Sequence, residues 1–243
     1  MITLDKSPAN SYDIYFFNEF EKVLNAIETD KEIAVVLLKS AIPKFFCAGA
    51  DIKVFASNTV EQNNEMVAMA NKIAKMISSS SKIFIAFLNG HTLGGGLELA
   101  VACDIRLASN KKFLIGLPEV KLGLMPGNGG IPRLVNAVGH SYAFELVVSG
   151  NPINPEEAFR IGLAHKLYNE ETAEDETLEY VTNLSKGPKI AMATIKQTFA
   201  IGVGKSTQEF LKLETEMVDT LYNTFDAKEG FQSFVEKRVP KFE

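Results

Sequence analysis

Cysteine and histidine are scarce in this chain. It has two cysteines, Cys47 and Cys103, and three histidines among 243 residues. Two cysteines do not make a disulfide framework, and no cysteine or histidine lies at the spacing of a metal site. We therefore expect a reduced, cytoplasmic protein that needs no metal.

Long apolar runs and blocks of basic residues are also missing. No apolar run approaches the length of about 18 residues that indicates a membrane-spanning helix. The opening residues, MITLDKSPANSYD, lack the basic and apolar regions of a signal peptide. The formal net charge is −5, so we expect neither nucleic acid nor membrane as a partner. A local basic spot could still bind a phosphorylated small molecule.

The pattern that is present alternates between strands and helices. The chain is 46% hydrophobic and 23% charged, which is typical of a soluble fold with a substantial core. Periodicity predicts several elements up to residue 116: helices at 14–27, 60–78 and 97–104, and strands at 33–40, 82–90, 105–109 and 113–116. This order of strand, turn and helix predicts an α/β architecture.

Beyond Gly127 the pattern becomes helical. The segments with helical periodicity are 130–138, 140–148, 155–161, 172–186, 189–200 and 206–224. We therefore expect an α/β core over residues 1–186 and a helical region over 187–243. The last predicted helix carries an apolar stripe that includes Phe210, Leu213 and Met217, and a stripe at a chain end favours assembly with other subunits.

Three consecutive glycines, Gly94, Gly95 and Gly96, stand at the start of the predicted helix 97–104. Each costs roughly 1 kcal/mol relative to alanine inside a helix, so their presence needs a reason. A tight turn or close backbone packing is one explanation. The other is a ligand lying against bare backbone at a helix N-terminus, where free N–H groups stabilise a phosphate or an enolate-like oxygen. The spacing matches neither a Walker A loop nor GxGxxG.

A second turn of small residues follows the first buried strand. It lies in FFCAGADIK, residues 45–53, and presents the backbone of Ala48, Gly49 and Ala50. Two such turns could each direct one N–H at the same carbonyl oxygen, which is the usual arrangement of an oxyanion hole.

Two glutamates are candidate catalytic residues. Glu98 lies close to these glycines in the sequence, and Glu119 follows the predicted strand 113–116. Glu98 stands one helical turn after Gly95, among apolar neighbours. Each has a plain alternative, because most glutamates are exposed. Glu98 could lie on a surface helix, and Glu119 could cap a helix or pair with Lys121.

Three blocks in one order resemble the enoyl-CoA hydratase/isomerase (crotonase) family. The blocks are FCAGADIK, NGHTLGGGLELAVACDIRLAS and PEVKLGLMPGNGGIPRL. The resemblance implies a spiral of β-β-α units with a helical C-terminal region, assembled as trimers that are usually paired into hexamers. It also implies that the N–H groups of Ala50 and Gly95 polarise a thioester carbonyl. Coenzyme A would then be part of the substrate, with no separate cofactor.

The pair of glutamates resembles that of the hydrating family members. It implies that Glu98 activates water and that Glu119 carries the proton exchanged at the α-carbon, so that water adds to a 2-enoyl-CoA. An isomerase, a decarboxylase, a hydrolase and a non-catalytic scaffold of the same fold stay as alternatives.

The resemblance also implies substrate-binding positions. Around the first turn these are Ala48, Asp51, Ile52 and Lys53, with Lys53 expected near the coenzyme A diphosphate. The remaining candidates are Leu117 and Ile131 at the acyl pocket, and Phe234 and Lys237, which are expected to reach coenzyme A from a neighbouring subunit.

The opening of the chain departs from the family pattern. PANSYD stands where many members have Pro-x-x-Asn-Ala-Leu, and the opening strand is expected to be short or missing.

Overall fold

The computed structural model describes all 243 residues and contains two parallel β-sheets. The larger sheet has the strand order β1-β2-β4-β6-β8, and the smaller has the order β3-β5-β7. The strands of the larger sheet are β1 (Ile2–Leu4), β2 (Val35–Ser40), β4 (Ile83–Leu88), β6 (Ile105–Ser109) and β8 (Lys166–Tyr168). Those of the smaller sheet are β3 (Phe45–Cys47), β5 (His91–Leu93) and β7 (Ile115–Gly116).

Along the chain, a strand of the larger sheet is followed by a strand of the smaller sheet, and one or two helices then lead back to the larger sheet. Thus β2, β4 and β6 belong to the larger sheet, and β3, β5 and β7 follow them in the smaller one. The helices after each strand pair are α2 (Ile52–Ser57) with α3 (Val60–Ser79), α4 (Gly95–Ala102), and the 3₁₀ helix η1 (Pro118–Leu122) with α5 (Gly130–Ser149). This repetition of β-β-α units confirms the predicted fold class.

Alternate residues of the central strands face two different layers of core. In β4, Phe84, Ala86 and Leu88 belong to the main cluster with residues of α1 (Ile14–Thr29), α3 and α4. Ile85 and Phe87 belong to a second cluster, which includes Ala173 at the start of α7 (Ala173–Ser185). Because successive side chains of a strand point to opposite faces, this fully apolar strand is buried on both sides.

Several predicted boundaries differ from the observed ones. The expected opening strand is short but present, since β1 pairs with β2 over three residues. The segments 130–138 and 140–148 form one element, α5, with a kink at Gly139 (φ 77°, ψ 165°). The predicted helix 155–161 corresponds to α6 (Pro155–Arg160). The predicted helix 206–224 ends early, and a further helix, α10 (Phe225–Glu236), was missed.

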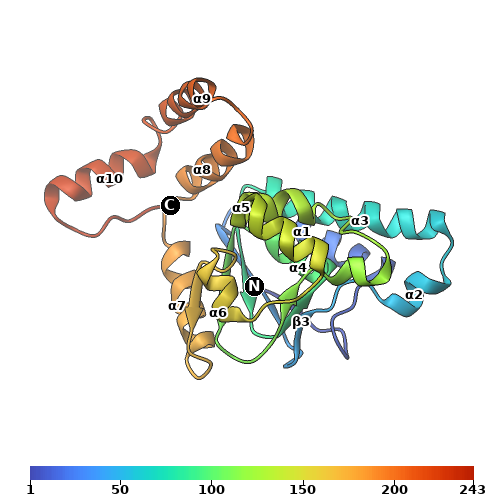
Figure 1. Cartoon of the computed structure of the whole chain (residues 1–243). Coiled ribbons are helices and arrows are strands. Elements are labelled where there is room, and N and C mark those ends of the chain that lie inside the picture. Colours follow the sequence, from blue (N-terminus) through green and yellow to red (C-terminus); the bar gives the residue numbers. More distant parts are fainter.

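The last three helices form an arm, in which α8 (Lys189–Gly202) contacts the body and the rest stands away from it (Figure 1). They are α8, α9 (Thr207–Asp219) and α10. Lys196 fastens α8 to the body: its buried ammonium donates to the carbonyl oxygens of Ile77 and Lys82 and to Oδ2 of Asp104, each at 2.8 Å. All three donors of the ammonium group are therefore used.

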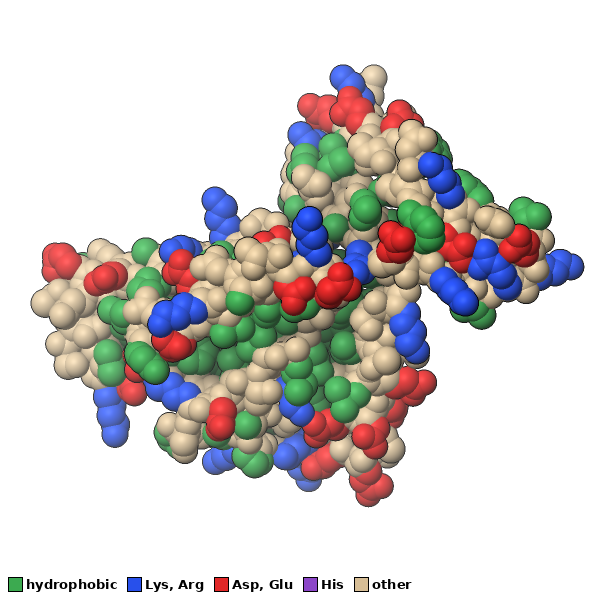
Figure 2. Space-filling model, turned by 180° about the vertical axis from the view of Figure 1, so that it is seen from behind, with side chains coloured by type: hydrophobic (Ala, Val, Ile, Leu, Met, Phe, Trp, Pro, Cys, Tyr) green, Lys and Arg blue, Asp and Glu red, His purple; other side chains and the backbone are tan.

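Large apolar side chains remain exposed on the arm. Examples are Phe199, Phe231 and Val239, with exposed fractions of 66%, 65% and 82%. Figure 2 shows further hydrophobic side chains gathered along a hollow on the back face of the body. None of the helices has both the length and the apolar character required to span a bilayer.

Candidate active site

The two small-residue turns are in direct contact. Gly49 and Gly94 both have positive φ, 82° and 54°, which is a conformation that favours glycine. A Cβ atom on Gly49 would lie 2.8 Å from the nitrogen of Gly95 and 3.0 Å from the carbonyl oxygen of Leu93. The glycine at position 49 therefore allows the loop after β3 to reach the N-terminus of α4.

Two backbone donors lie at this contact. The N–H of Ala50 has no acceptor within the chain, although its neighbours pair with Tyr12. Gly95 is the first residue of α4, the position at which an N–H has no acceptor inside the helix. The structure thus brings the predicted oxyanion donors, Ala50 and Gly95, onto adjoining backbone segments.

Glu98 lies one turn along α4 and is buried, with 2% exposure. Its Oε1 accepts hydrogen bonds from the N–H groups of Asn128 (2.7 Å) and Gly130 (3.0 Å). Burial raises the pKa of Glu98, while these two N–H groups and the charge of Arg133 oppose the rise. The alternative of a solvated surface glutamate is wrong for this residue.

Glu119 lies in η1 and faces Gly94. A Cβ on Gly94 would lie 3.1 Å from Oε1 of Glu119. Its other oxygen, Oε2, is buried and has no hydrogen-bond partner. Burial, with a smaller contribution from the charge of Glu98, raises the pKa of Glu119 to about 7. Lys121 donates to Asn151 instead, so the alternative pairing of Glu119 with Lys121 is not observed.

Sequence reasoning missed two polar side chains that join this cluster. Nδ2 of Asn128 donates to the hydroxyl oxygen of Tyr12 at 2.9 Å. That hydroxyl occupies the space of a side chain at position 95, since a Cβ on Gly95 would lie 1.6 Å from it. The only sequence signal was the departure of PANSYD from the family pattern, a stretch that contains Tyr12.

The candidates around the first turn lie at the start of α2. Ala48 is partly exposed, and Ile52 and Lys53 are exposed. Asp51 is the N-cap of α2 and accepts from the N–H groups of Lys53 and Val54. The Asp51 carboxylate therefore stabilises the N-terminus of α2, which explains an aspartate at this position without a ligand.

The two acyl-pocket candidates differ in burial. Leu117 is only 1% exposed and belongs to the main core cluster. Ile131 is half-buried in the first turn of α5, next to Gly130, whose N–H bonds Glu98. Of the two, Ile131 is the one with a surface open to a ligand.

Phe234 and Lys237 lie far along the arm, in α10 and at its C-cap. Phe234 is 87% exposed. Within one chain the structure does not bring either residue to the glutamates, because the arm stands away from the body (Figure 1).

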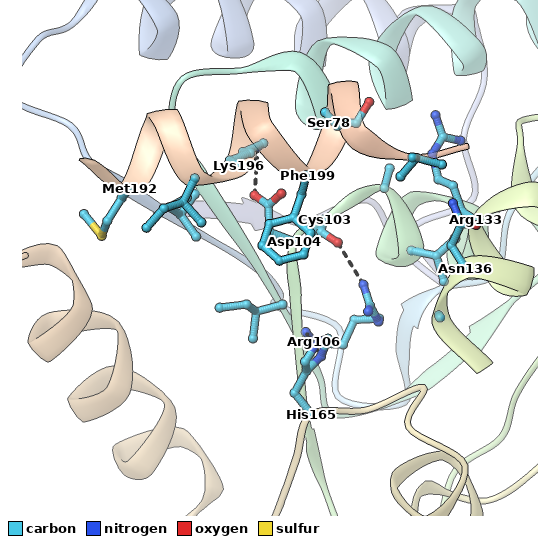
Figure 3. A pocket seen from close by; sticks show the side chains of 18 of the residues that line it. Ser78, Cys103, Asp104, Arg106, Arg133, Asn136, His165, Met192, Lys196 and Phe199 are labelled. Atoms are coloured by element: carbon cyan, nitrogen blue, oxygen red, sulfur yellow. Dashed lines mark hydrogen bonds and ion pairs between the residues drawn. The ribbon is translucent and has the colours of Figure 1, made fainter. Parts of the chain in front are cut away.

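A large cavity of the chain lies elsewhere. It has a volume of about 680 Å³, lies between α8 and the segment after α4, and includes none of the predicted site residues. Figure 3 shows its charged groups bonded to the protein itself: Lys196 to Asp104, and Arg106 to the carbonyl oxygen of Cys103 at 2.8 Å. We therefore place the candidate active site at the glutamates, not in this cavity.

Comparison with known proteins connects this geometry to a family. The profile of the enoyl-CoA hydratase/isomerase family matches residues 1–243. The chain belongs to the enoyl-CoA hydratase/isomerase family. The expected enzyme class, hydratase-like carbon–oxygen lyases, is thereby confirmed.

Individual members of the enoyl-CoA hydratase/isomerase family match over nearly the whole chain. A probable enoyl-CoA hydratase of Bacillus subtilis (strain 168) is 36% identical, covering 100% of this chain and 94% of that protein. A short-chain-enoyl-CoA hydratase of Clostridium acetobutylicum is 33% identical, covering 98% and 91%. A crystal structure of the enoyl-CoA hydratase of Bacillus anthracis superposes with a TM-score of 0.95 at 32% identity, covering 99% and 93%.

Proposed function

We propose that this enzyme adds water across the 2,3 double bond of a 2-enoyl-CoA thioester and forms a 3-hydroxyacyl-CoA. The observation that carries the proposal is the presence of both glutamates beside the two adjoining backbone segments of Ala50 and Gly95. Glu119 faces Gly94, and Glu98 lies one turn beyond it. The names of the Bacillus and Clostridium relatives also support hydration.

In the proposed reaction, the oxygen of water bonds to the β-carbon as one of its O–H bonds breaks, and Glu98 accepts the proton. The π electrons move toward the thioester oxygen, where the N–H groups of Ala50 and Gly95 stabilise the developing charge. Glu119 then delivers a proton to the α-carbon, and the carbonyl is restored. Burial, with a smaller contribution from the charge of Glu98, raises the pKa of Glu119 to about 7, which favours Glu119 as the carboxyl group that holds the proton before substrate binds.

The test is product analysis with purified protein and a short 2-enoyl thioester, crotonyl-CoA. A hydratase removes the absorbance of the conjugated double bond and yields the 3-hydroxy product, which mass spectrometry identifies. With a 3-enoyl-CoA, an isomerase would instead create that absorbance. Turnover of 3-enoyl-CoA alone would replace our proposal with the isomerase alternative, and no acyl-CoA binding in calorimetry would support the scaffold.

We also propose that the arm, residues 187–243, assembles the enzyme into a homotrimer or a pair of trimers. The exposed apolar side chains of the arm support this, because an isolated chain would leave them in water. Phe234 and Lys237 would then bind coenzyme A at a neighbouring subunit. Size-exclusion chromatography with light scattering should give three or six times the chain mass of 26.7 kDa; a single-chain mass would contradict assembly.

The proposed reaction needs no cofactor, because coenzyme A enters as part of the substrate. The proposal specifies no length for the acyl chain of the substrate, and Ile131 is the side chain best placed to influence that length. A cytoplasmic location stays a prediction.

A further inference from the structure

Behind Glu98, on the side of the core, lies a polar pair that the proposed reaction does not use. The pair is Tyr12, in the loop before α1, and Asn128, in the loop before α5. Tyr12 is 5% exposed and Asn128 is 6% exposed. Burying a polar group costs free energy unless hydrogen bonds compensate for it, so two buried polar side chains at these positions require an explanation.

Neither side chain has its full set of partners. The Tyr12 oxygen accepts from Asn128 and donates its own proton to no protein atom. Oδ1 of Asn128 is buried without a partner. Burial, with the charge of Glu98 next in effect, raises the pKa of Tyr12 well above its ordinary value. Tyr12 is therefore a neutral hydroxyl with one proton available as a hydrogen-bond donor.

A small cavity joins this pair to Glu98. It has a volume of about 10 Å³, and its polar side chains are those of Tyr12, Glu98 and Asn128. The rest of its wall is apolar except for backbone: Phe17, Ala70, Ile73, Ala74, Gly95 and Leu99. This volume is close to the minimum that one water molecule needs, and the Tyr12 hydroxyl and the Glu98 carboxylate belong to residues that line the same small space.

We propose that Tyr12 and Asn128 are positioning residues for Glu98, and that they hold its carboxylate ionised and oriented toward the substrate through a hydrogen bond from the core side. The inference rests on the proposed hydration reaction. Asn128 contributes twice, because its backbone N–H binds Oε1 of Glu98 while its side chain orients the hydroxyl of Tyr12.

Other charged and titratable groups near Glu98 also affect the ionisation of its carboxyl group. Arg133, in α5, favours the ionised carboxylate, and Glu119, in η1, is a like charge that disfavours it. Cys47, in β3, lies near Tyr12, and burial raises the pKa of its thiol to about 12, so it stays neutral. From the core side, the side-chain amide of Asn128 also favours the ionised carboxylate, and the Tyr12 hydroxyl lines the same small cavity as Glu98 with a proton that no protein atom accepts.

The test is Tyr12→Phe, which keeps the ring and removes the hydroxyl. Loss of a hydrogen bond to a charged group should lower kcat for crotonyl-CoA hydration by about 10-fold or more, with KM changed by less than about 2-fold. The acidic limb of the pH profile should move up by about one unit, because Glu98 is harder to ionise. Exchange of the α-protons of butyryl-CoA with deuterated solvent should persist, since that step needs Glu119 and not activated water.

An activity-independent readout separates this inference from the hydratase assignment. In protein labelled with ¹³C at glutamate carboxyl carbons, NMR titration should show a higher pKa for Glu98 in Tyr12→Phe than in the parent. This holds even if the parent enzyme hydrates nothing, in which case only the proposed function fails. An unchanged Glu98 titration, or an exchange rate that falls as far as hydration does, overturns the positioning role.

Two further variants complete the design. Asn128→Ala should act in the same direction, and the double variant should be little worse than Tyr12→Phe alone, because the two residues form one network. Tyr15→Phe removes a hydroxyl from the exposed face of α1 and should change none of these measurements. Strictly additive effects of the two single variants would count against a shared network.

Discussion

Glu119→Gln should lower the turnover of crotonyl-CoA by at least about 100-fold. In the proposed reaction Glu119 delivers a proton to the α-carbon, and an amide cannot transfer one in this way. Exchange of the α-protons of butyryl-CoA should be lost together with hydration, because both depend on the same carboxyl group. Initial rates of absorbance loss and proton NMR measure the two effects. Near-normal turnover would remove Glu119 from the mechanism.

The pKa of about 7 for Glu119 also sets the expected pH dependence. Hydration needs the protonated carboxylic acid, so kcat/KM of the parent enzyme should fall as the pH rises above about 7. The residual activity of Glu119→Gln should lack this basic limb. A basic limb that persists unchanged in the variant would assign the titration to another group.

The same substitution should stabilise the fold at alkaline pH. The folded-state pKa of Glu119, about 7, lies above its ordinary value of 4.5. Its contribution to stability is therefore fully present below pH 4.5 and is lost as the pH rises through 7, where a charge appears in a buried place. Thermal unfolding should show a higher Tm for Glu119→Gln near pH 9 and no gain near pH 4.5. Glu145→Gln, at an exposed position of α5, is the matched control.

Glu98→Gln should also lower hydration by at least about 100-fold, for a different reason. A glutamine oxygen still accepts from the N–H groups of Asn128 and Gly130, so the fold should be kept, but the amide cannot accept the proton of water. The α-proton exchange that we assign to Glu119 should therefore survive better than hydration does. Equal loss of both steps would mean that Glu98 does not act on water alone.

Glu98→Ala separates the structural part of this residue from the chemical part. Alanine leaves the two N–H groups without an acceptor, which should cost about 1–3 kcal/mol of unfolding free energy for each buried group left unsatisfied. Urea unfolding measures this cost. If Glu98→Gln were as unstable as Glu98→Ala, its loss of activity would report on folding and not on proton transfer.

Local patterns in the sequence predict most of the body of this fold. The strand of residues 83–88 is apolar at every position and buried on both faces, and the glycines at 94–96 mark the start of α4. Helix α10 was missed because Gly230 interrupts its middle and the predicted helix before it was extended too far. Thr224, the N-cap of α10, is only a weak indication of a new helix start, because the apolar stripe of the predicted helix 206–224 extends up to it.

The candidate site was only partly accessible from the sequence. The positive φ of Gly49 and Gly94 is a local property of the two turns, so the turns could be anticipated. The need for glycine at position 95 could not, because the Tyr12 hydroxyl that fills the space beside it comes from a distant part of the sequence. The pairing of Tyr12 with Asn128 joins residues 116 positions apart, and no local pattern contains that information. The burial of Leu117 and the remoteness of Phe234 from the glutamates likewise follow from how the chain is packed and where the arm points.

The buried ammonium of Lys196 has a consequence for shortening this protein. Its partner Asp104 lies two residues after the end of α4, the helix that carries Glu98. A truncation that removed the C-terminal helices would leave a largely buried aspartate without its counter-ion. It would also free two carbonyl oxygens, those of Ile77 and Lys82. The arm therefore helps to support the end of the helix that carries Glu98, and a shortened protein without the arm should lose part of that support as well.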